Sequence, residues 1–123
     1  MNLYTYRAQV LRVVDGDTLD LMVSLGFDMH HKTRFRLTGI NAPESYGPTA
    51  CAEGRAAKQF LTDLLPVGTT VVVKTSKDKK EKYGRFLAEV YLLDAKGEVL
   101  PQAVNALMVE KGHAKPYFGG ARG

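Results

Sequence analysis

Five charged residues in the sequence have types and positions that suit hydrolysis of a phosphodiester. Asp15 and Asp17 flank a glycine at a predicted tight turn, and Glu44 directly follows a proline. Arg36 lies within a strand-like segment, and Arg85 follows a Tyr-Gly pair. Carboxylate oxygens can hold a hard cation, and guanidiniums can bind a phosphate bidentately. A further carboxylate can activate water for attack.

Each of these residues also has an ordinary explanation when it is taken alone. An Asp-Gly-Asp triplet is usually a turn, an arginine on a strand is usually exposed, and Pro-Glu usually belongs to a loop. The combination favours chemistry if the fold brings the segments together. The fold must therefore place the turn at 15–17, Arg36, the loop at 41–44 and Arg85 at one end of the molecule.

Hydrophobic periodicity predicts five strands and two helices. Alternating, β-branched segments mark the strands, and apolar residues at three- and four-residue spacing mark the first helix. Gly16 is expected to take a positive φ in the first turn, residues 26–31 form a second turn, and Gly112 suits the position after the second helix. The predicted strands cover residues 10–14, 18–23, 33–40, 69–75 and 86–93, and the predicted helices cover 55–65 and 101–111.

The order of these elements predicts a fold. A helix between the third and fourth strands of a five-stranded barrel is the OB-fold arrangement, here with a second helix after strand five. The fold class is therefore a β-barrel with helices, of the α+β type. The length of 123 residues suits one domain, which is expected to span 8–115, with a frayed glycine-rich tail at 116–123.

The excess positive charge is concentrated in one segment. The chain has a formal net charge of +4, and residues 74–85 hold six basic and two acidic residues, while the remainder balances. Such a segment suits a polyanionic partner, because phosphate contacts release counterions. A solvated lysine-rich loop is the alternative on charge alone.

Other classes of protein are disfavoured by composition. Cys51 is the one cysteine, so an internal disulfide is impossible, and no Cys/His set has zinc-binding spacing. No apolar stretch reaches the roughly 20 residues of a membrane span, and the first residues lack the pattern of a signal peptide. We therefore expect no membrane association, no obligate protein partner and a cytoplasmic location, with secretion open if the chain is a trimmed piece.

Four motifs make the sequence resemble the staphylococcal nuclease (thermonuclease) family. They are Val14-Asp15-Gly16-Asp17-Thr18, Phe35-Arg36-Leu37 with Ile40-Asn41-Ala42-Pro43-Glu44, Lys82-Tyr83-Gly84-Arg85, and the second helix from Val104-Asn105 to Gly112-His113-Ala114. The resemblance spans roughly residues 8 to 115. It implies an OB barrel and a Ca²⁺-dependent endonuclease that acts on DNA and RNA.

The resemblance also implies roles for individual residues. Asp17, the side chain of Asn41 and the carbonyl of Ala42 would bind the metal. Asp15 would lie next to these ligands without binding the metal itself. Glu44 would act as the general base. Where the family usually has an aspartate, this chain has Asn41, so one negative charge is missing.

The substrate side of the implied site is basic and aromatic. Arg36 and Arg85 would bind the phosphate, and Lys82 would contact the nucleic acid. Tyr83 would lie near the 5′ phosphate, and Tyr117, or the neighbouring Phe118, would pack against a base. Asn105 is expected to be a buried hydrogen-bonding residue of the second helix.

Three alternatives compete with an active nuclease. The domain could bind nucleic acid without catalysis, it could be a nuclease weakened by Asn41 and active only at high calcium, or its basic segment could be incidental. The presence of Asp17, Arg36, Glu44 and Arg85 favours the enzyme over the binding domain.

Overall fold

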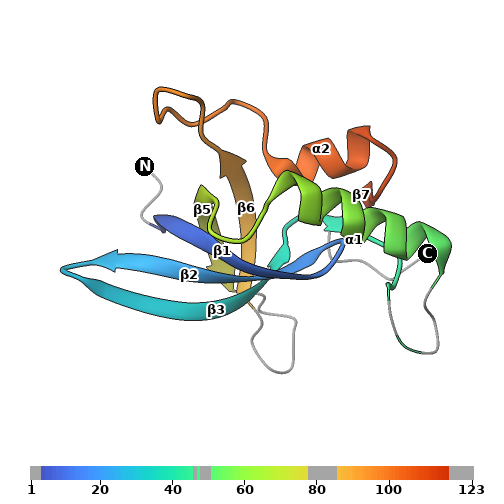
Figure 1. Ribbon diagram of the computed structural model, residues 1–123, viewed down its shortest axis with the longest axis horizontal. Coiled ribbons are helices and arrows are strands. Elements are labelled where there is room, and N and C mark those ends of the chain that lie inside the picture. Colours follow the sequence, from blue (N-terminus) through green and yellow to red (C-terminus); the bar gives the residue numbers. More distant parts are fainter. Residues whose placement is uncertain (1–3, 46, 48–50, 78–85, 117–123) are drawn as a thin grey trace.

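The computed structural model describes residues 4–45, 47, 51–77 and 86–116. Within these ranges the chain forms seven strands and two helices, arranged around a barrel (Figure 1). The strands are β1 (Thr5–Asp15), β2 (Thr18–Gly26), β3 (Met29–Leu37), β4 (Ile40–Asn41), β5 (Thr70–Lys77), β6 (Phe86–Leu92) and β7 (Lys115–Pro116), and the helices are α1 (Ala52–Leu64) and α2 (Val104–Glu110).

Five strands close a barrel in the order β1-β2-β3-β6-β5. Neighbouring strands are antiparallel except β3 and β6, which run parallel and pair Phe35 with Phe86. The short strands β4 and β7 form a separate pair beside the barrel. Helix α1 joins β4 to β5, so the predicted five-stranded OB-type barrel is confirmed.

The core fills the barrel and the space beneath the helices. Alternate residues of the strands point inward, and helix α1 packs on β1 through Ala57 and Leu61, which are both completely buried. Helix α2 packs on β6, with Val104 and Met108 buried. Burying a valine, leucine or methionine side chain contributes about 1.5–3 kcal/mol, so this core fixes the relative positions of the barrel and both helices.

Several element boundaries differ from the sequence-based predictions. Strand β3 begins at Met29, and the turn before it consists of Phe27 and Asp28 alone. The sequence pattern did not predict this earlier start, because residues 29–32 are exposed and show no apolar alternation. Helix α2 begins at Val104 instead of residue 101. Gly112 has φ 77° and follows the helix as predicted.

The ends of the fold also lie slightly outside the expected limits. Strand β1 starts at Thr5, and Pro116 pairs with Ile40 in the β4–β7 sheet, one residue beyond the expected end of the domain. Among the described residues, no helix is long and apolar enough to span a membrane.

Candidate active site

The turn between β1 and β2 is packed tightly against two other segments. A Cβ atom added to Gly16 would lie 2.7 Å from the Cβ of Ala57 in α1 and 2.9 Å from the Cβ of Ala42. Gly16 does not take the positive φ expected from the sequence. Glycine is required here for close approach, which brings the turn, helix α1 and the segment after β4 together.

Asp17 is buried, with 7% of its surface exposed, and both its backbone and its side chain accept hydrogen bonds. Its Oδ2 accepts a hydrogen bond from the backbone N–H of Ala42 at 2.9 Å, and its Oδ1 accepts one from Thr18 Oγ1 at 3.1 Å. The Asp17 carbonyl accepts the N–H of Leu37 at 2.8 Å. Asp17 is therefore held through its backbone by the end of β3 and through its carboxylate by the segment after β4.

Arg36 connects Asp17 with Asn41. The Arg36 side chain is 11% exposed, and its Nη2 donates to Asn41 Oδ1 at 2.9 Å and lies 3.9 Å from Asp17 Oδ2. Pairing of Arg36 with Thr18 across β3 and β2 positions the guanidinium, and pairing of Asn41 with Lys115 fixes strand β4. Asp17, Arg36, Asn41 and Ala42, which the sequence assigned to one site, thus form one cluster.

Glu44 is anchored by its backbone, and the residue is exposed. Its carbonyl oxygen accepts hydrogen bonds from Cys51 N at 3.2 Å and from Cys51 Sγ at 3.8 Å. Cys51 also caps helix α1, because its Sγ accepts from Gly54 N at 3.4 Å. A Cβ at Gly54 would overlap the Glu44 carbonyl group. Neither Cys51 nor Gly54 was expected from the sequence to position Glu44, since neither residue carries a charge.

The donor set of the cluster suits a hard cation. The Asp17 carboxylate and the Asn41 carboxamide both offer oxygen, the ligand type that Ca²⁺ and Mg²⁺ prefer. No group of three or more His, Cys, Asp or Glu residues capable of holding a metal occurs in the part of the chain that the structure describes. The half-buried cluster therefore supplies one full negative charge, from Asp17, and a neutral oxygen, from Asn41, which also accepts a hydrogen bond from Arg36.

Five further residues were assigned to the site from the sequence, and the structure describes one of them, Asp15. The Asp15 carboxylate accepts the N–H of Gly16 at 3.2 Å, which stabilises the turn. The other four predicted site residues lie outside the described ranges: Lys82, Tyr83, Arg85 and Tyr117.

Asn105 holds the strands next to the cluster, as predicted for a buried hydrogen-bonding residue. Its Nδ2 donates to Thr38 O at 2.8 Å and to Ala88 O at 3.0 Å, and its Oδ1 accepts from Val90 N at 3.0 Å. Helix α2 therefore ties the end of β3 to β6. An unpaired buried amide would cost about 1–3 kcal/mol, so this network fixes the strand that carries Arg36.

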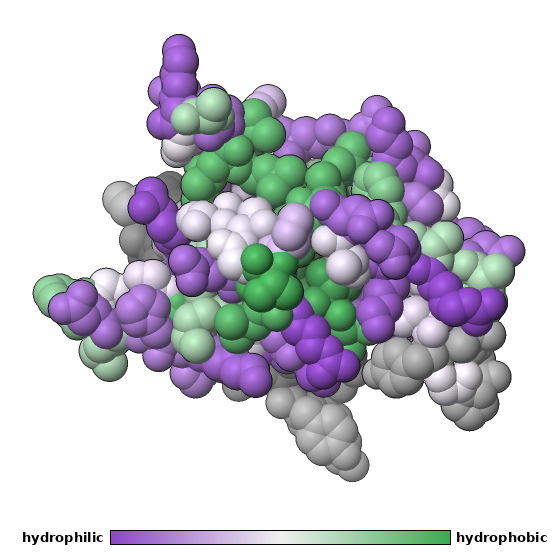
Figure 2. All heavy atoms as spheres, in the orientation of Figure 1, coloured by the Kyte–Doolittle hydropathy of each residue, from purple (hydrophilic) through white to green (hydrophobic). Residues whose placement is uncertain are grey.

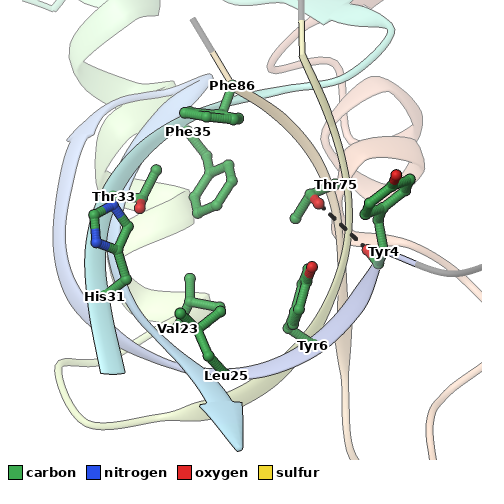
Figure 3. Close-up of a pocket in the computed structure, with 9 residues that line it drawn as sticks. All are labelled: Tyr4, Tyr6, Val23, Leu25, His31, Thr33, Phe35, Thr75 and Phe86. Atoms are coloured by element: carbon green, nitrogen blue, oxygen red, sulfur yellow. Dashed lines mark hydrogen bonds between the residues drawn. The ribbon is translucent and has the colours of Figure 1, made fainter. Parts of the chain in front are cut away.

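An apolar cavity lies elsewhere in the described structure. It has a volume of about 270 Å³ and opens at one end of the barrel, between the aromatic rings of Tyr6, Phe35 and Phe86 (Figure 3). None of Asp17, Arg36 or Asn41 lines it. The polar cluster is thus a separate feature of the surface.

Comparison with known proteins identifies the family. Residues 34–122 match the family model described as staphylococcal nuclease homologue. A micrococcal nuclease of Shigella flexneri is 35% identical over 91% of this chain, and a thermonuclease of Staphylococcus intermedius is 32% identical over 89%. The endonuclease YhcR of Bacillus subtilis (strain 168) is 33% identical over 92%.

The chain spans part of each of these relatives. It covers 59% of the Shigella protein, 58% of the Staphylococcus protein and 9% of YhcR. The family match nevertheless covers most of the chain and agrees with the closed barrel, so the resemblance read from the motifs is confirmed. The chain belongs to the staphylococcal nuclease homologue family.

Proposed function

We propose that this protein is a Ca²⁺-dependent endonuclease that hydrolyses phosphodiester bonds in DNA and RNA. The observation that carries the proposal is the cluster of Asp17, Arg36 and Asn41, in which a buried carboxylate, a guanidinium and an amide oxygen meet at the ends of three segments. Several relatives, including the Shigella and Staphylococcus proteins, are named as nucleases.

In this proposal the chain binds and orients the phosphate. Arg36 binds a nonbridging oxygen and stabilises the charge that accumulates in the five-coordinate transition state. Asp17, Asn41 and the Ala42 carbonyl would hold Ca²⁺, which when bound neutralises phosphate charge and polarises the phosphorus–oxygen bonds. Anchoring of Asp17 by the Ala42 N–H keeps the carboxylate in place without substrate.

Glu44 is the proposed general base. Its carboxylate accepts a proton from a water molecule as the water oxygen bonds to phosphorus, and the phosphorus–O5′ bond breaks as O5′ takes up a proton from solvent. By analogy with the family, the products are a 3′ phosphate and a 5′ hydroxyl. The exposed position of Glu44 beside the anchored loop leaves its carboxylate accessible to water.

The proposed substrate contacts come from the segment before β6. Phe86, the first residue of β6, pairs with Phe35, and Leu87 pairs with Arg36. Arg85 directly precedes this pairing, which supports its assignment as the second phosphate-binding arginine. We assign Lys82 and Tyr83 to the substrate backbone and Tyr117 to a base on the same motif argument.

Cleavage assays test the proposal. Plasmid DNA and RNA should be cut with Ca²⁺ and remain intact with chelator. Glu44→Gln should lower turnover about 10²-fold or more, while the charge-matched control Glu53→Gln, in the first turn of α1, should behave as wild type. Undiminished cutting in chelator would contradict the proposal. Oligonucleotide binding without cleavage at any calcium concentration would indicate a binding domain instead.

A further inference from the structure

A row of basic residues follows the outer side of β3 and ends at the candidate active site. His30, Lys32 and Arg34 are exposed and alternate along the strand with residues that point into the barrel end, such as Phe35 (Figure 3). Because side chains two apart share a face of a strand, this row continues into Arg36. Figures 1 and 2 place the β2–β3 hairpin that carries most of the row at the left of the view.

The neighbouring strands add charge to the same face. Arg12 on β1 pairs with Asp20 on β2, which pairs with Arg34 on β3. Arg34 Nε donates to Asp20 Oδ1 at 2.8 Å, and this hydrogen bond, with weaker effects of Lys32 and Arg12, lowers the pKa of the Asp20 carboxyl. One carboxylate is thus surrounded by three cations, which leaves an excess of two positive charges.

Few acidic residues oppose this charge. Within β1, β2 and β3, all of which the structure describes, the acidic residues are Asp20 and Asp15. Asp15 is the last residue of β1 and lies at the turn beside Asp17. Basic side chains therefore outnumber carboxylates among the outward-facing residues of these three strands.

A polar hollow lies at the far end of the row. Its volume is about 210 Å³, and it includes His30, the first basic residue of the row. A guanidinium, an imidazole, an amide and two hydroxyl groups line it, and its lining includes no carboxylate. The lining residues are Arg7, Ala8, Gln9, Met22, Ser24, His30 and Thr70.

The spacing of the row suits an extended polynucleotide strand. Residues two apart on a strand are separated by about 6.6 Å, so the interval from His30 to Arg36 is about 20 Å. The separation of successive phosphates in an extended single strand is comparable to the distance between neighbouring basic residues of the row. Lysine and arginine bind phosphate through charge, and the hollow offers hydrogen-bond donors for a further phosphate or sugar.

We propose that the outer face of β1–β3 is a binding track for a single-stranded polynucleotide, which leads from Arg36 past Arg12 and Lys32 to the hollow at Arg7 and His30. This inference rests on the proposed nuclease function and adds a surface that binds substrate away from the bond that is cut. The track consists of residues of β1–β3, and none of them belongs to the basic sequence segment at 74–85.

The test neutralises two positions while preserving the Arg34–Asp20 pair. Arg12→Gln with Lys32→Gln removes two positive charges and leaves the buried Asp20 carboxylate with its partner. Lys96→Gln with Lys111→Gln removes the same charge from exposed positions in the turn after β6 and at the end of α2. Binding of each protein to a single-stranded oligonucleotide of about 12 nucleotides is measured in chelator across a salt series.

The track predicts a specific change in affinity. The Arg12/Lys32 variant should bind the oligonucleotide about tenfold more weakly at low salt, and the salt slope should fall by about 0.7 for each phosphate that the variant no longer binds. Its rate on a dinucleotide, which is too short to extend from Arg36 to Arg12 and Lys32, should equal that of wild type. The Lys96/Lys111 variant should show little change in either measurement.

Two outcomes of the salt series would overturn the inference. The first is a salt slope of the Arg12/Lys32 variant that equals that of wild type. The second is an equal loss of affinity in both variants, which would mean that net charge alone determines binding. Binding to anionic vesicles that depends on Arg12 and Lys32, without an effect on oligonucleotides, would assign the face to a lipid surface. If wild type cuts nothing but the slope difference persists, the proposed nuclease function fails and the track stands.

Discussion

Among single residues, Asn41 has the greatest bearing on the proposed metal site. Its side-chain oxygen accepts a hydrogen bond from Arg36 at 2.9 Å, and the same guanidinium lies 3.9 Å from the Asp17 carboxylate. A neutral oxygen at this position leaves Asp17 as the one acidic group among the described residues of this half-buried cluster. Calcium sites tune affinity through the number of charged ligands, so this cluster should bind calcium weakly in the absence of phosphate.

Asn41→Asp should tighten calcium binding at least about tenfold, equivalent to about 1.4 kcal/mol. The added carboxylate supplies a second negative charge beside Asp17, and the calcium concentration for half-maximal cleavage should fall in parallel. Calorimetric titration of both proteins measures the change. Equal affinities would instead indicate that Asn41 serves mainly to hold Arg36.

At the scale of elements, the start of helix α1 determines where Glu44 lies. The Glu44 carbonyl accepts the N–H of Cys51, and Cys51 caps the helix through Gly54. Gly54 is buried and leaves space for the Glu44 carbonyl group. The start of the helix therefore fixes the backbone of the proposed base, although the Glu44 residue itself is exposed.

Gly54→Ala should reduce both stability and turnover. Alanine normally stabilises a helix by up to about 1 kcal/mol relative to glycine, but here its Cβ would overlap the Glu44 carbonyl and displace the loop. Turnover should fall about tenfold or more, as expected for a misplaced base. Ala56→Gly, at an exposed position of the same helix, is the control: it should lower the free energy of unfolding and leave turnover unchanged. Similar turnover in both variants would contradict this role.

A second element, the β2–β3 hairpin, carries avoidable strain. Phe27 and Asp28 form its two-residue turn with φ of 56° and 62°, a conformation that favours asparagine and glycine. Phe27 is 99% exposed, and its neighbours Leu25 and Met29 at the hairpin tip are also exposed. The turn therefore lacks both favourable residues and compensating burial.

Replacing Phe27-Asp28 with Asn-Gly should stabilise the protein by about 1 kcal/mol, because both residues then tolerate a left-handed backbone. Urea denaturation measures the change in unfolding free energy. Turnover on a dinucleotide should stay at the wild-type level, because the turn lies at the opposite end of β3 from Arg36. A loss of stability would mean that Phe27 makes contacts that this turn geometry does not explain.

At the scale of the whole molecule, positive charge is distributed unevenly. The net charge of +4 is concentrated in the sequence at 74–85, yet the folded barrel gathers a second set of cations on the outer face of β1–β3. Cations separated along the chain meet on this face because neighbouring strands place paired residues side by side. Both regions should contribute to polynucleotide affinity, and their contributions should be separable by mutation.

Neutralising Lys77, Lys79, Lys80 and Lys82 together should weaken polynucleotide binding and reduce the salt slope by about 0.7–0.9 for each phosphate that is no longer bound. The measurement is a salt series of oligonucleotide affinities, compared with that of the Arg12/Lys32 variant. Reductions that add when both sets are changed would indicate two independent binding regions. An unchanged slope would show that the 77–82 segment does not touch the substrate.

The sequence by itself determined the class of fold and the members of the cluster. Period-two segments, a helical segment after the third strand and the motif around 15–18 and 35–44 were sufficient, because each signal is local along the chain. The same local signals missed the first part of β3, since residues 29–32 are exposed and carry no apolar alternation. They also gave Gly16 a conformational role, where close packing is the reason for glycine.

The tertiary structure alone decided how these residues meet. The hydrogen bond from the Ala42 N–H to Asp17 joins residues 25 positions apart, and the alignment of Arg12, Asp20 and Arg34 depends on the registers of three strands. The anchoring of Glu44 by Cys51 depends on the start of α1. Such interactions follow from barrel closure and side-chain packing, which involve the whole chain at once and leave no pattern in any single segment.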